Sequence, residues 1–342
     1  MLFGKVRRSI RLVQLLALAL PLSAFGARAL AQSVNVDAAK KEGKAIIYGT
    51  VVPKVMGQIQ KGFEAKYGIK TEYWRADATK VIDRVLTEWR SGRPGFDIVI
   101  GARGPLALGK KDGVYAKFSP ASAASFPAKF KDNDGQLNAW RVTPVGVLYN
   151  TDLVKANDVP KSLDDLLDAK WQNKLSMPDP SRHASTAQYL WNLRQIKGDK
   201  WMDFVKGLAK QKPMLLESYS TVPNTIVRGE SWAGITYVQY AAQTKGPINF
   251  APISQIFADP SDAALSAKAT NSNAAKLFID YLCSPDGQKK VAEAGEFVLS
   301  PGIYPAIQGA DKIAANLSMM EDPSAETLAK LQSEFRQLFL AK

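Results

Sequence analysis

Short apolar runs alternate with amphipathic repeats along the first third of this chain, and this alternation restricts the fold more than any other feature of the sequence. The apolar runs lie at 44–50 and 96–102, and 69–76 alternates apolar with polar residues; each of the three segments has the length of a β-strand. Between them, 54–68 and 79–92 repeat apolar side chains every three or four residues and end at glycines, as amphipathic helices do. The order strand–helix–strand–helix–strand predicts an α/β lobe.

A second set of elements follows an extended segment at 142–151, where the helical periodicity stops and Pro144 and Gly146 occur. Beyond it we expect helices over 162–171, 185–198, 200–211 and 222–230, and strands over 174–180 and 232–237. The predicted fold class is therefore α/β with two lobes, each a mostly parallel sheet flanked by helices, with a cleft between them.

The two lobes divide the chain at the extended segment. The chain has 342 residues, which is enough for two lobes with separate apolar cores. We expect lobe 1 to span 32–143 and to be completed by about 248–290, and lobe 2 to span 144–247. Helices within 291–342 should then pack on the lobes.

The first 31 residues have the pattern of a secretory signal peptide. A basic head with Lys5, Arg7, Arg8 and Arg11 precedes an apolar run and a small-x-small exit that ends at Ala31. The Arg7–Arg8 pair also resembles a twin-arginine signal, so both export routes stay open. In either case, residues 1–31 predict export to the periplasm and cleavage.

The distribution of charge argues against a nucleic-acid partner. The formal net charge is +13, but the sequence has no run of five or more like charges and no basic block interleaved with aromatic residues. A moderate positive field suits an anionic small molecule, or serves solubility alone. We therefore expect a small, anionic ligand and no nucleic acid.

The side-chain inventory does not supply a common catalytic centre. The chain has one histidine, His183, and one cysteine, Cys283, a hundred residues apart, which is too few for a zinc site. The chain has no G-x-S-x-G elbow, Walker loop or dinucleotide fingerprint. We expect no enzyme activity, cofactor or resident metal, and a buried structural thiol at Cys283. Two distant acids can still meet in the fold, so an exported enzyme on this scaffold remains an alternative.

Polar residues follow four of the predicted strands at their C-terminal ends, where open parallel sheets bind ligands. These ends lie at Thr50 and Val51, at Arg103, at 179–186 and at 218–225. Hydroxyls and free backbone N–H groups at helix starts favour carboxylate or phosphate-like groups. The alternative is that Ser185 or Ser220 only caps its helix. For His183, the lining of a cleft or the capping of a helix is favoured over ligand contact.

Taken in order, several segments resemble the substrate-binding component of bacterial ABC importers, of the extracellular solute-binding type that includes ferric-iron-binding proteins. These segments are 38–50, 81–100, 146–154, 160–180, 216–230, 232–243 and 273–291. The resemblance covers nearly the whole chain after residue 31. It implies the two-lobed fold of type II periplasmic binding proteins, a ligand in the cleft, hinge closure on binding and delivery to an inner-membrane ABC permease. We expect a monomer.

The resemblance also bears on the type of ligand. Ferric-iron-binding members resemble one another in a pair of adjacent tyrosines after the strand that here spans 232–237, whereas this chain has Tyr237 and Tyr240. Phenolate oxygens suit Fe(III), but Arg103 would repel a cation. We therefore predict a small anionic solute, with ferric iron on Tyr237 and Tyr240 and a synergistic anion as the alternative. The expected cleft residues are Thr50, Val51, Arg103, Arg182, His183, Ser185, Ser220, Thr221 and Tyr237.

Overall fold

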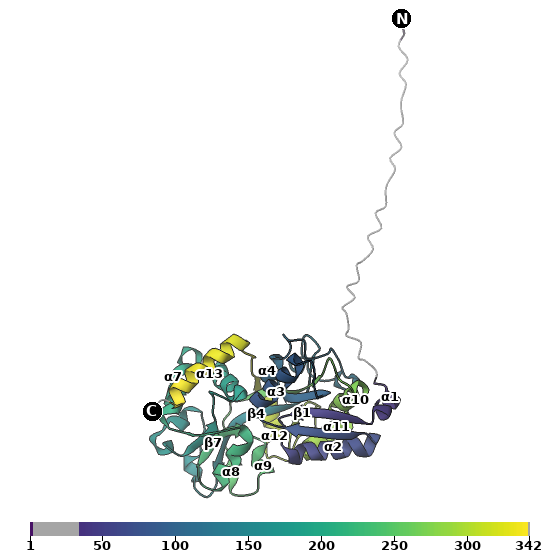
Figure 1. Cartoon of the computed structure of the whole chain (residues 1–342). Coiled ribbons are helices and arrows are strands. Elements are labelled where there is room, and N and C mark those ends of the chain that lie inside the picture. Colours follow the sequence, from purple (N-terminus) through teal and green to yellow (C-terminus); the bar gives the residue numbers. More distant parts are fainter. Residues whose placement is uncertain (3–33, 341–342) are drawn as a thin grey trace. The chain divides into compact units, whose positions relative to one another are not determined.

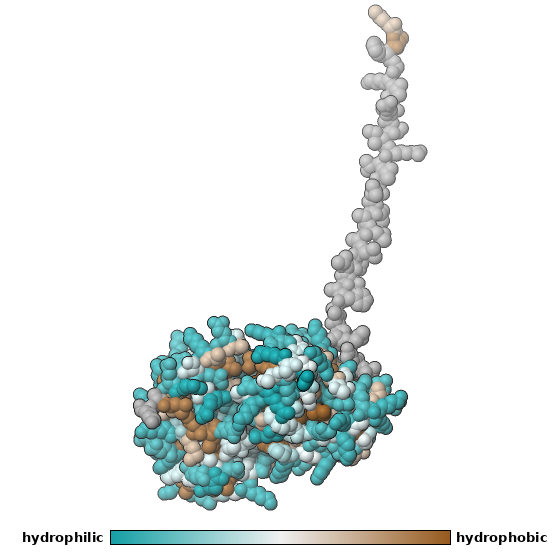
Figure 2. Space-filling model, in the orientation of Figure 1, coloured by the Kyte–Doolittle hydropathy of each residue, from teal (hydrophilic) through white to brown (hydrophobic). Residues whose placement is uncertain are grey.

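The computed structural model describes residues 1–2 and 34–340, and the predicted signal peptide at 1–31 lies outside this part except for its first two residues (Figure 1). Within the described part, no helix has the length and apolar character that a membrane span requires. The face of the molecule in Figure 2 is mostly hydrophilic, with hydrophobic residues scattered between polar ones.

The first lobe is built on three parallel strands, as the sequence predicts. β1 (Lys44–Gly49) lies between β2 (Lys70–Arg75) and β3 (Ile98–Ala102). The helices α2 (Pro53–Tyr67) and α3 (Ala78–Arg90) connect these strands and bury their apolar faces. All five elements lie within two residues of the predicted bounds, because the apolar pattern of each is local and both helices end beside a glycine.

The second lobe repeats this plan. β5 (Leu175–Pro178) pairs in parallel with β6 (Met214–Leu216) and with β7 (Ala233–Tyr237). The helices of this lobe are α5 (Ala184–Asn192), α6 (Arg194–Lys197), α7 (Trp201–Lys210), α8 (Val222–Val227) and α9 (Tyr240–Gln243). The expected two-lobed α/β architecture is thus present in the described part of the chain.

Two long strands cross between the lobes. β4 (Leu137–Asn150) and β9 (Ile256–Leu265) are antiparallel to each other, and they join both sets of parallel strands into one sheet with the order β2-β1-β3-β9-β4-β7-β5-β6. β4 pairs with β7 on the side of the second lobe, and β9 pairs with β3 on the side of the first. The predicted change of lobe at residue 143 falls inside β4.

β9 is a buried central strand that the local sequence pattern does not predict. It contains Asp259, Pro260 and Asp262, and these residue types are rare in strand interiors. Its outer edge pairs with β11 (Leu317–Met319) before Pro260 and with β3 after it. Pro260 therefore lies between two partners, where a missing N–H leaves no gap in either ladder.

The predicted helix over 162–171 is wrong. The structure has two short 3₁₀ turns there, Asp164–Leu167 and Ala169–Trp171. Asp165 accepts hydrogen bonds from the backbone N–H of Lys161 and from both the N–H and the hydroxyl of Ser162. Such local bonds compete with the helical ladder, while the tighter turns still place Leu166 in the core.

Each lobe has its own apolar core, and the core changes along β4 between Val142 and Val145. The first core also contains residues of α10 (Ser272–Cys283) and α12 (Ala310–Ala315), and the second contains the inner face of α13 (Ala325–Leu340). Cys283 is buried in the first core, as expected for a structural thiol. The remaining elements are α1 (Val36–Glu42), α4 (Arg103–Ala107), β8 (Ile248–Phe250), α11 (Pro285–Glu293) and β10 (Phe297–Val298).

Candidate ligand-binding site

A cavity lies between the two lobes, at the carboxyl ends of their parallel strands. The centre of a water-sized sphere can occupy about 40 Å³ of it, and the whole space between the lining atoms, open solvent at the mouth included, is about 470 Å³. We call it the interlobe cavity; its lining residues are Thr50, Arg75, Asp77, Ala78, Ala102, Arg141, Thr143, His183, Ser185, Ser218, Tyr219, Ser220, Tyr237, Tyr240 and Ser261. β1, β2, β3 and β7 each have a lining residue at or just beyond their last residue, and Ser218 and His183 follow the ends of β6 and β5 by two and five residues. This edge is where open α/β sheets bind ligands.

Two guanidinium groups dominate the chemistry of this cavity. Arg75 is the last residue of β2, and its Nη2 donates to Ser220 Oγ of the other lobe at 2.8 Å. Arg141 lies in β4, is only 6% exposed and forms an ion pair with the buried carboxylate of Glu296. The Nε atoms of both arginines are buried and have no hydrogen-bond partner among the described residues. Both residues line the interlobe cavity, so their guanidinium groups are the candidate donors for a bound solute.

The position of the Arg141 guanidinium is set by a buried polar network. Glu296 is 1% exposed, and its oxygens accept hydrogen bonds from the side-chain amides of Gln239 at 3.2 Å and Gln243 at 3.0 Å. Ser261 lies directly opposite Arg141 on β9, and its buried hydroxyl also lacks a partner among the described residues. The two crossing strands thus present a fixed cation and a free hydroxyl side by side.

His183 caps α5 and lines the interlobe cavity. Its Nδ1 lies 3.3 Å from the backbone nitrogen of Thr186 and 2.8 Å from the Thr186 hydroxyl, and its ring packs edge-on against Tyr219 with centroids 5.2 Å apart. Burial lowers the pKa of His183 to about 4, against the opposing effect of Asp77. The imidazole is therefore neutral at physiological pH.

Three tyrosines form one wall. The ring centroids of Tyr219 and Tyr237 are 4.5 Å apart, and those of Tyr237 and Tyr240 are 5.8 Å apart. Burial raises the pKa of Tyr237 and of Tyr240, while Arg141 acts in the opposite direction on both. These side chains are phenols that can donate a hydrogen bond. No group of three or more histidine, cysteine or acidic residues that could hold a metal ion occurs in the described part of the chain.

The structure brings five of the nine expected cleft residues together. Thr50, His183, Ser185, Ser220 and Tyr237 line the interlobe cavity. Hydroxyls and helix starts at strand ends were the signal for four of these residues, and they converge because the carboxyl ends of both sheets face the same space.

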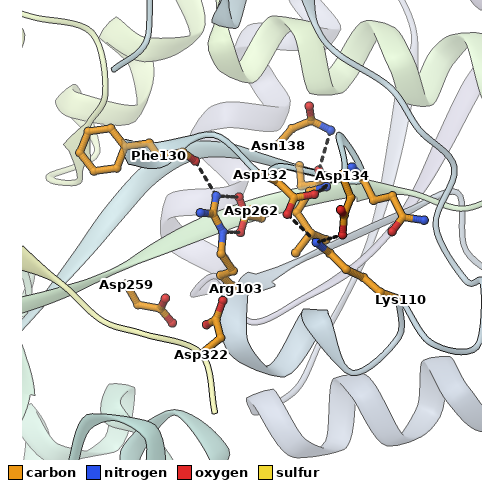
Figure 3. Close-up of polar contacts among 12 residues, drawn as sticks. Arg103, Lys110, Phe130, Asp132, Asp134, Asn138, Asp259, Asp262 and Asp322 are labelled. Carbon is orange, nitrogen blue, oxygen red and sulfur yellow. Dashed lines mark hydrogen bonds and ion pairs between the residues drawn. The ribbon is translucent and has the colours of Figure 1, made fainter. Parts of the chain in front are cut away.

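The other four expected residues lie outside the lining. Arg103 donates to both oxygens of Asp262 at 2.8 and 2.9 Å, beside Asp259 and Asp322, so its charge is compensated within the fold (Figure 3). Arg182 donates to Asp179 at 3.0 Å, and its side chain is 76% exposed. The remaining two make local contacts: the Val51 carbonyl accepts from the Tyr73 hydroxyl, and the Thr221 hydroxyl donates to the Ser218 carbonyl.

Sequence reasoning missed the arginines that do line the cavity. Arg75 follows the same rule as the residues that were found, because it ends the second strand of a parallel set, and that rule could have located it. Arg141, Thr143 and Ser261 lie on the crossing strands β4 and β9, far from any strand end. Their place in the cavity results from strand pairing over more than a hundred residues, for which the sequence carries no local signal.

Comparison with known families agrees with this geometry. The family model described as bacterial extracellular solute-binding protein matches residues 94–325, which is more than half of the chain. The chain belongs to this family. The solute-binding protein is also 31% identical over 108 residues to a probable ABC transporter periplasmic-binding protein from Sinorhizobium fredii. That match covers 31% of this chain and 30% of the relative, so it spans less than a third of either.

Solved structures share the fold of this solute-binding protein. The periplasmic binding protein AfuA from Actinobacillus pleuropneumoniae, with exogenous fructose-6-phosphate bound, is 20% identical, with 87% of this chain and 97% of that chain covered and a TM-score of 0.70. Iron-bound HitA from Pseudomonas aeruginosa is 18% identical, with coverage of 87% and 98% and a TM-score of 0.66. At these identities the likeness shows the two-lobed periplasmic binding protein fold, as predicted.

Proposed function

We propose that this protein is the periplasmic component of an ABC importer, that it captures a small anionic solute in the interlobe cavity, and that it delivers the solute to an inner-membrane permease. The observation that carries the proposal is that two guanidinium groups, those of Arg75 and Arg141, line the interlobe cavity, each with an Nε donor that has no partner among the described residues. Export follows from the signal pattern at 1–31.

An anion satisfies this donor set better than a neutral or cationic solute. A buried donor without a partner costs about 1–3 kcal/mol, and the cost is larger for a charged group, so an acceptor at this position has a strong advantage. Guanidinium groups match the planar, paired oxygens of carboxylates and phosphates. The hydroxyls of Thr50, Ser185 and Ser261 add further donors around the same space.

Capture without turnover fits the state of His183. Its Nδ1 is engaged by the cap of α5, and a pKa of about 4 makes it a weak base at neutral pH. A general base for chemistry on the solute would need a higher proton affinity and a nucleophile within reach. We therefore assign binding, and not catalysis, to this cavity.

Closure of the lobes is part of the proposed mechanism. Arg75 donates to Ser220 across the cavity, and the Thr79 hydroxyl donates to the Arg182 carbonyl at 2.7 Å. Lys80 and Glu217 form an ion pair across the same gap. These contacts stabilise a closed form in which the solute is shielded from water and the permease meets one defined surface.

The decisive experiment identifies the solute directly. Mass spectrometry of the compound released from protein purified without refolding should detect a small molecule with a carboxylate, phosphate or similar anionic group. Calorimetric titration should then show at least about tenfold weaker binding for Arg75→Gln and Arg141→Gln, as loss of a charge-assisted hydrogen bond predicts. Lys61→Gln, on the exposed face of α2, is the control for loss of one positive charge. Release of a cationic or uncharged compound would contradict the proposal.

Ferric iron is a second candidate, favoured by the 5.8 Å separation of the Tyr237 and Tyr240 rings on the cavity wall. In this case a synergistic anion would bind Arg75 and Arg141 beside the metal. Loading with Fe(III) should produce a tyrosinate-to-iron absorption band that chelators bleach and that Tyr240→Phe removes. A colourless protein after loading rules this candidate out.

A further inference from the structure

We propose that His183 binds the anionic solute as a neutral donor through its Nε2–H, in a tautomer that its role as the cap of α5 imposes. This inference rests on the proposed function and deepens it, because it assigns one specific, uncharged contact to the anion. It also explains why the one histidine of the chain lies where a helix cap and the interlobe cavity coincide.

The cap determines which ring nitrogen carries the proton. The backbone N–H of Thr186 points at Nδ1 from 3.3 Å, and the Thr186 hydroxyl lies 2.8 Å from the same atom. A proton on Nδ1 would point at the backbone N–H of Thr186, and the two donors would repel each other. Nδ1 therefore carries no proton and accepts the hydrogen bond from Thr186. A neutral imidazole with an accepting Nδ1 carries its single proton on Nε2.

The Nε2–H group is available to a solute. Within the described part of the chain, Nδ1 and the backbone account for all hydrogen bonds of His183, and the ring is on the wall of the interlobe cavity. Tyr219 supports the ring edge-on and keeps it from rotating out of the cap. His183 can thus donate to an anion that also contacts Arg75.

The surroundings keep the ring neutral while it donates. Burial, the positive end of α5 and the Arg75 guanidinium disfavour the imidazolium, and together they outweigh Asp77, Asp179 and Glu217, which favour it. Binding of the anion therefore needs no uptake of a proton by His183. Its contribution to affinity should be constant from about pH 5 upward, and any pH dependence in that range belongs to the solute.

Because His183 is the only histidine, nuclear magnetic resonance on protein labelled at histidine nitrogens reports on this residue alone. In the full chain without added anion, we expect a pyridine-type nitrogen at Nδ1 and a protonated, pyrrole-type nitrogen at Nε2, with no titration above about pH 5. Addition of inorganic phosphate should shift the Nε2–H signal and leave Nδ1 nearly unchanged. A protonated Nδ1, or a ring that titrates near its ordinary pKa, would overturn the proposal.

A pair of variants separates donation from capping. Asparagine is a good helix cap whose amide ends where Nδ1 lies, so His183→Asn keeps the cap and lacks an atom at the position of Nε2. We expect His183→Asn to melt closer to the wild-type temperature than His183→Ala does, but to bind inorganic phosphate about five- to tenfold more weakly than the wild type, as loss of one hydrogen bond predicts. His183→Ala should lose both the helix cap, with a lower melting temperature, and the affinity for phosphate. Wild-type affinity in His183→Asn would show that the histidine only caps.

The same measurements distinguish failure of this inference from failure of the proposed function. Phosphate binding that depends on Arg75 and Arg141 but leaves the Nε2–H signal unmoved would refute the histidine contact alone. A wild-type protein that binds no phosphate, and yields no anion on denaturation, would refute the anionic function together with the contact.

Discussion

At the scale of single residues, what matters for function is which charges the fold compensates. Arg103 is neutralised by both oxygens of Asp262, whereas Arg75 and Arg141 line the interlobe cavity and each have an Nε without a partner among the described residues. The Nε of Arg141 has no partner although Glu296 forms an ion pair with this side chain. The Glu296 carboxylate contacts Nη1 of the guanidinium group and leaves Nε without a contact. A partly compensated, buried cation is held in place and still has donors for a solute.

Glu296→Gln tests how much the ion pair between Glu296 and Arg141 contributes to the stability of the fold. The substitution leaves Arg141 buried without a counter-charge, which costs about 3 kcal/mol in typical buried pairs. We expect a lower midpoint of denaturant unfolding, with a smaller loss when inorganic phosphate is present to supply the missing negative charge. Glu230→Gln, in an exposed pair with Arg228, should not change the midpoint measurably. An unchanged midpoint for Glu296→Gln would refute the account.

Asp259 is the residue from which we expect pH-dependent stability. It is 1% exposed, neither carboxyl oxygen has a partner among the described residues, and Asp322 and Arg103 lie beside it (Figure 3). Burial, then Asp322 and Asp262, raise the pKa of Asp259 well above its ordinary value, and burial raises that of Asp322 to about 6. The folded state therefore binds these protons more tightly than the unfolded state does.

The sign of the effect follows from that difference in pKa. The stability that these two carboxyl groups contribute should be fully present below the ordinary carboxyl pKa of about 4 and should be lost as the pH rises through their raised values in the folded state. Asp259→Asn imitates the protonated form, so it should raise the melting temperature at pH 8 and flatten the profile between pH 5 and pH 8. A variant less stable than wild type at pH 8 would show that the ionised form is the native one.

At the scale of elements, the tight junction between β1 and β3 positions one side of the cavity. Gly49 ends β1 just before Thr50, and a Cβ built there would lie 2.7 Å from the Ile100 carbonyl of β3. Backbone cannot yield as a side chain does, so β1 and β3 can pack at this spacing only with glycine. The same two strands carry Thr50 and Ala102 to the cavity wall.

Gly49→Ala should therefore weaken the fold and the site together. Overpacking against backbone costs about 1–3 kcal/mol, and we expect this loss in chemical denaturation, along with weaker binding of the native solute. Gly57→Ala is the matched control, because a Cβ there meets nothing within 4 Å inside α2. It should stabilise the protein by about 0.5–1 kcal/mol through helix propensity. Equal behaviour of the two variants would contradict the argument.

At the scale of the whole molecule, the crossing strands β4 and β9 join the two lobes, whose apolar cores are separate, and a few hydrogen bonds across the cavity add to this connection. The Thr79 hydroxyl at the start of α3 donates to the Arg182 carbonyl, beside the bond from Arg75 to Ser220. The Lys80–Glu217 pair lies at the exposed rim, where ion pairs contribute little because water and salt screen them. The hydrogen bonds should thus matter more to closure than the ion pair does.

Thr79→Val tests this ranking. It removes the hydroxyl that bridges the lobes and keeps the shape of the side chain. We expect about fivefold weaker binding of the native solute, mainly through faster release, with an unchanged melting temperature of the unliganded protein. Glu217→Gln should alter affinity less than twofold at physiological salt. Stopped-flow release rates give the comparison, and a larger effect of Glu217→Gln would reverse the ranking.

The sequence by itself determined those elements whose apolar period and end signals are local. β1 to β3, α2 and α3 follow from such patterns, and the rule that ligands bind at strand ends places the cavity at Thr50, His183 and Ser185. The apolar pattern at 162–171 wrongly predicted an α-helix. Hydrogen bonds from Ser162 to the side chain of Asp165 compete there with the backbone hydrogen bonds of a helix.

Only the tertiary structure decided which charged residues line the interlobe cavity. Arg103 and Arg141 look alike in sequence, yet Arg103 meets Asp262, 159 residues away, while Arg141 faces the cavity from a crossing strand. β9 is a strand only because β3, β4 and β11 pair with it around Pro260. The physical reason is common to both cases: compensation of a buried charge and completion of a sheet depend on partners that are remote in the chain, and local propensity carries no information about them.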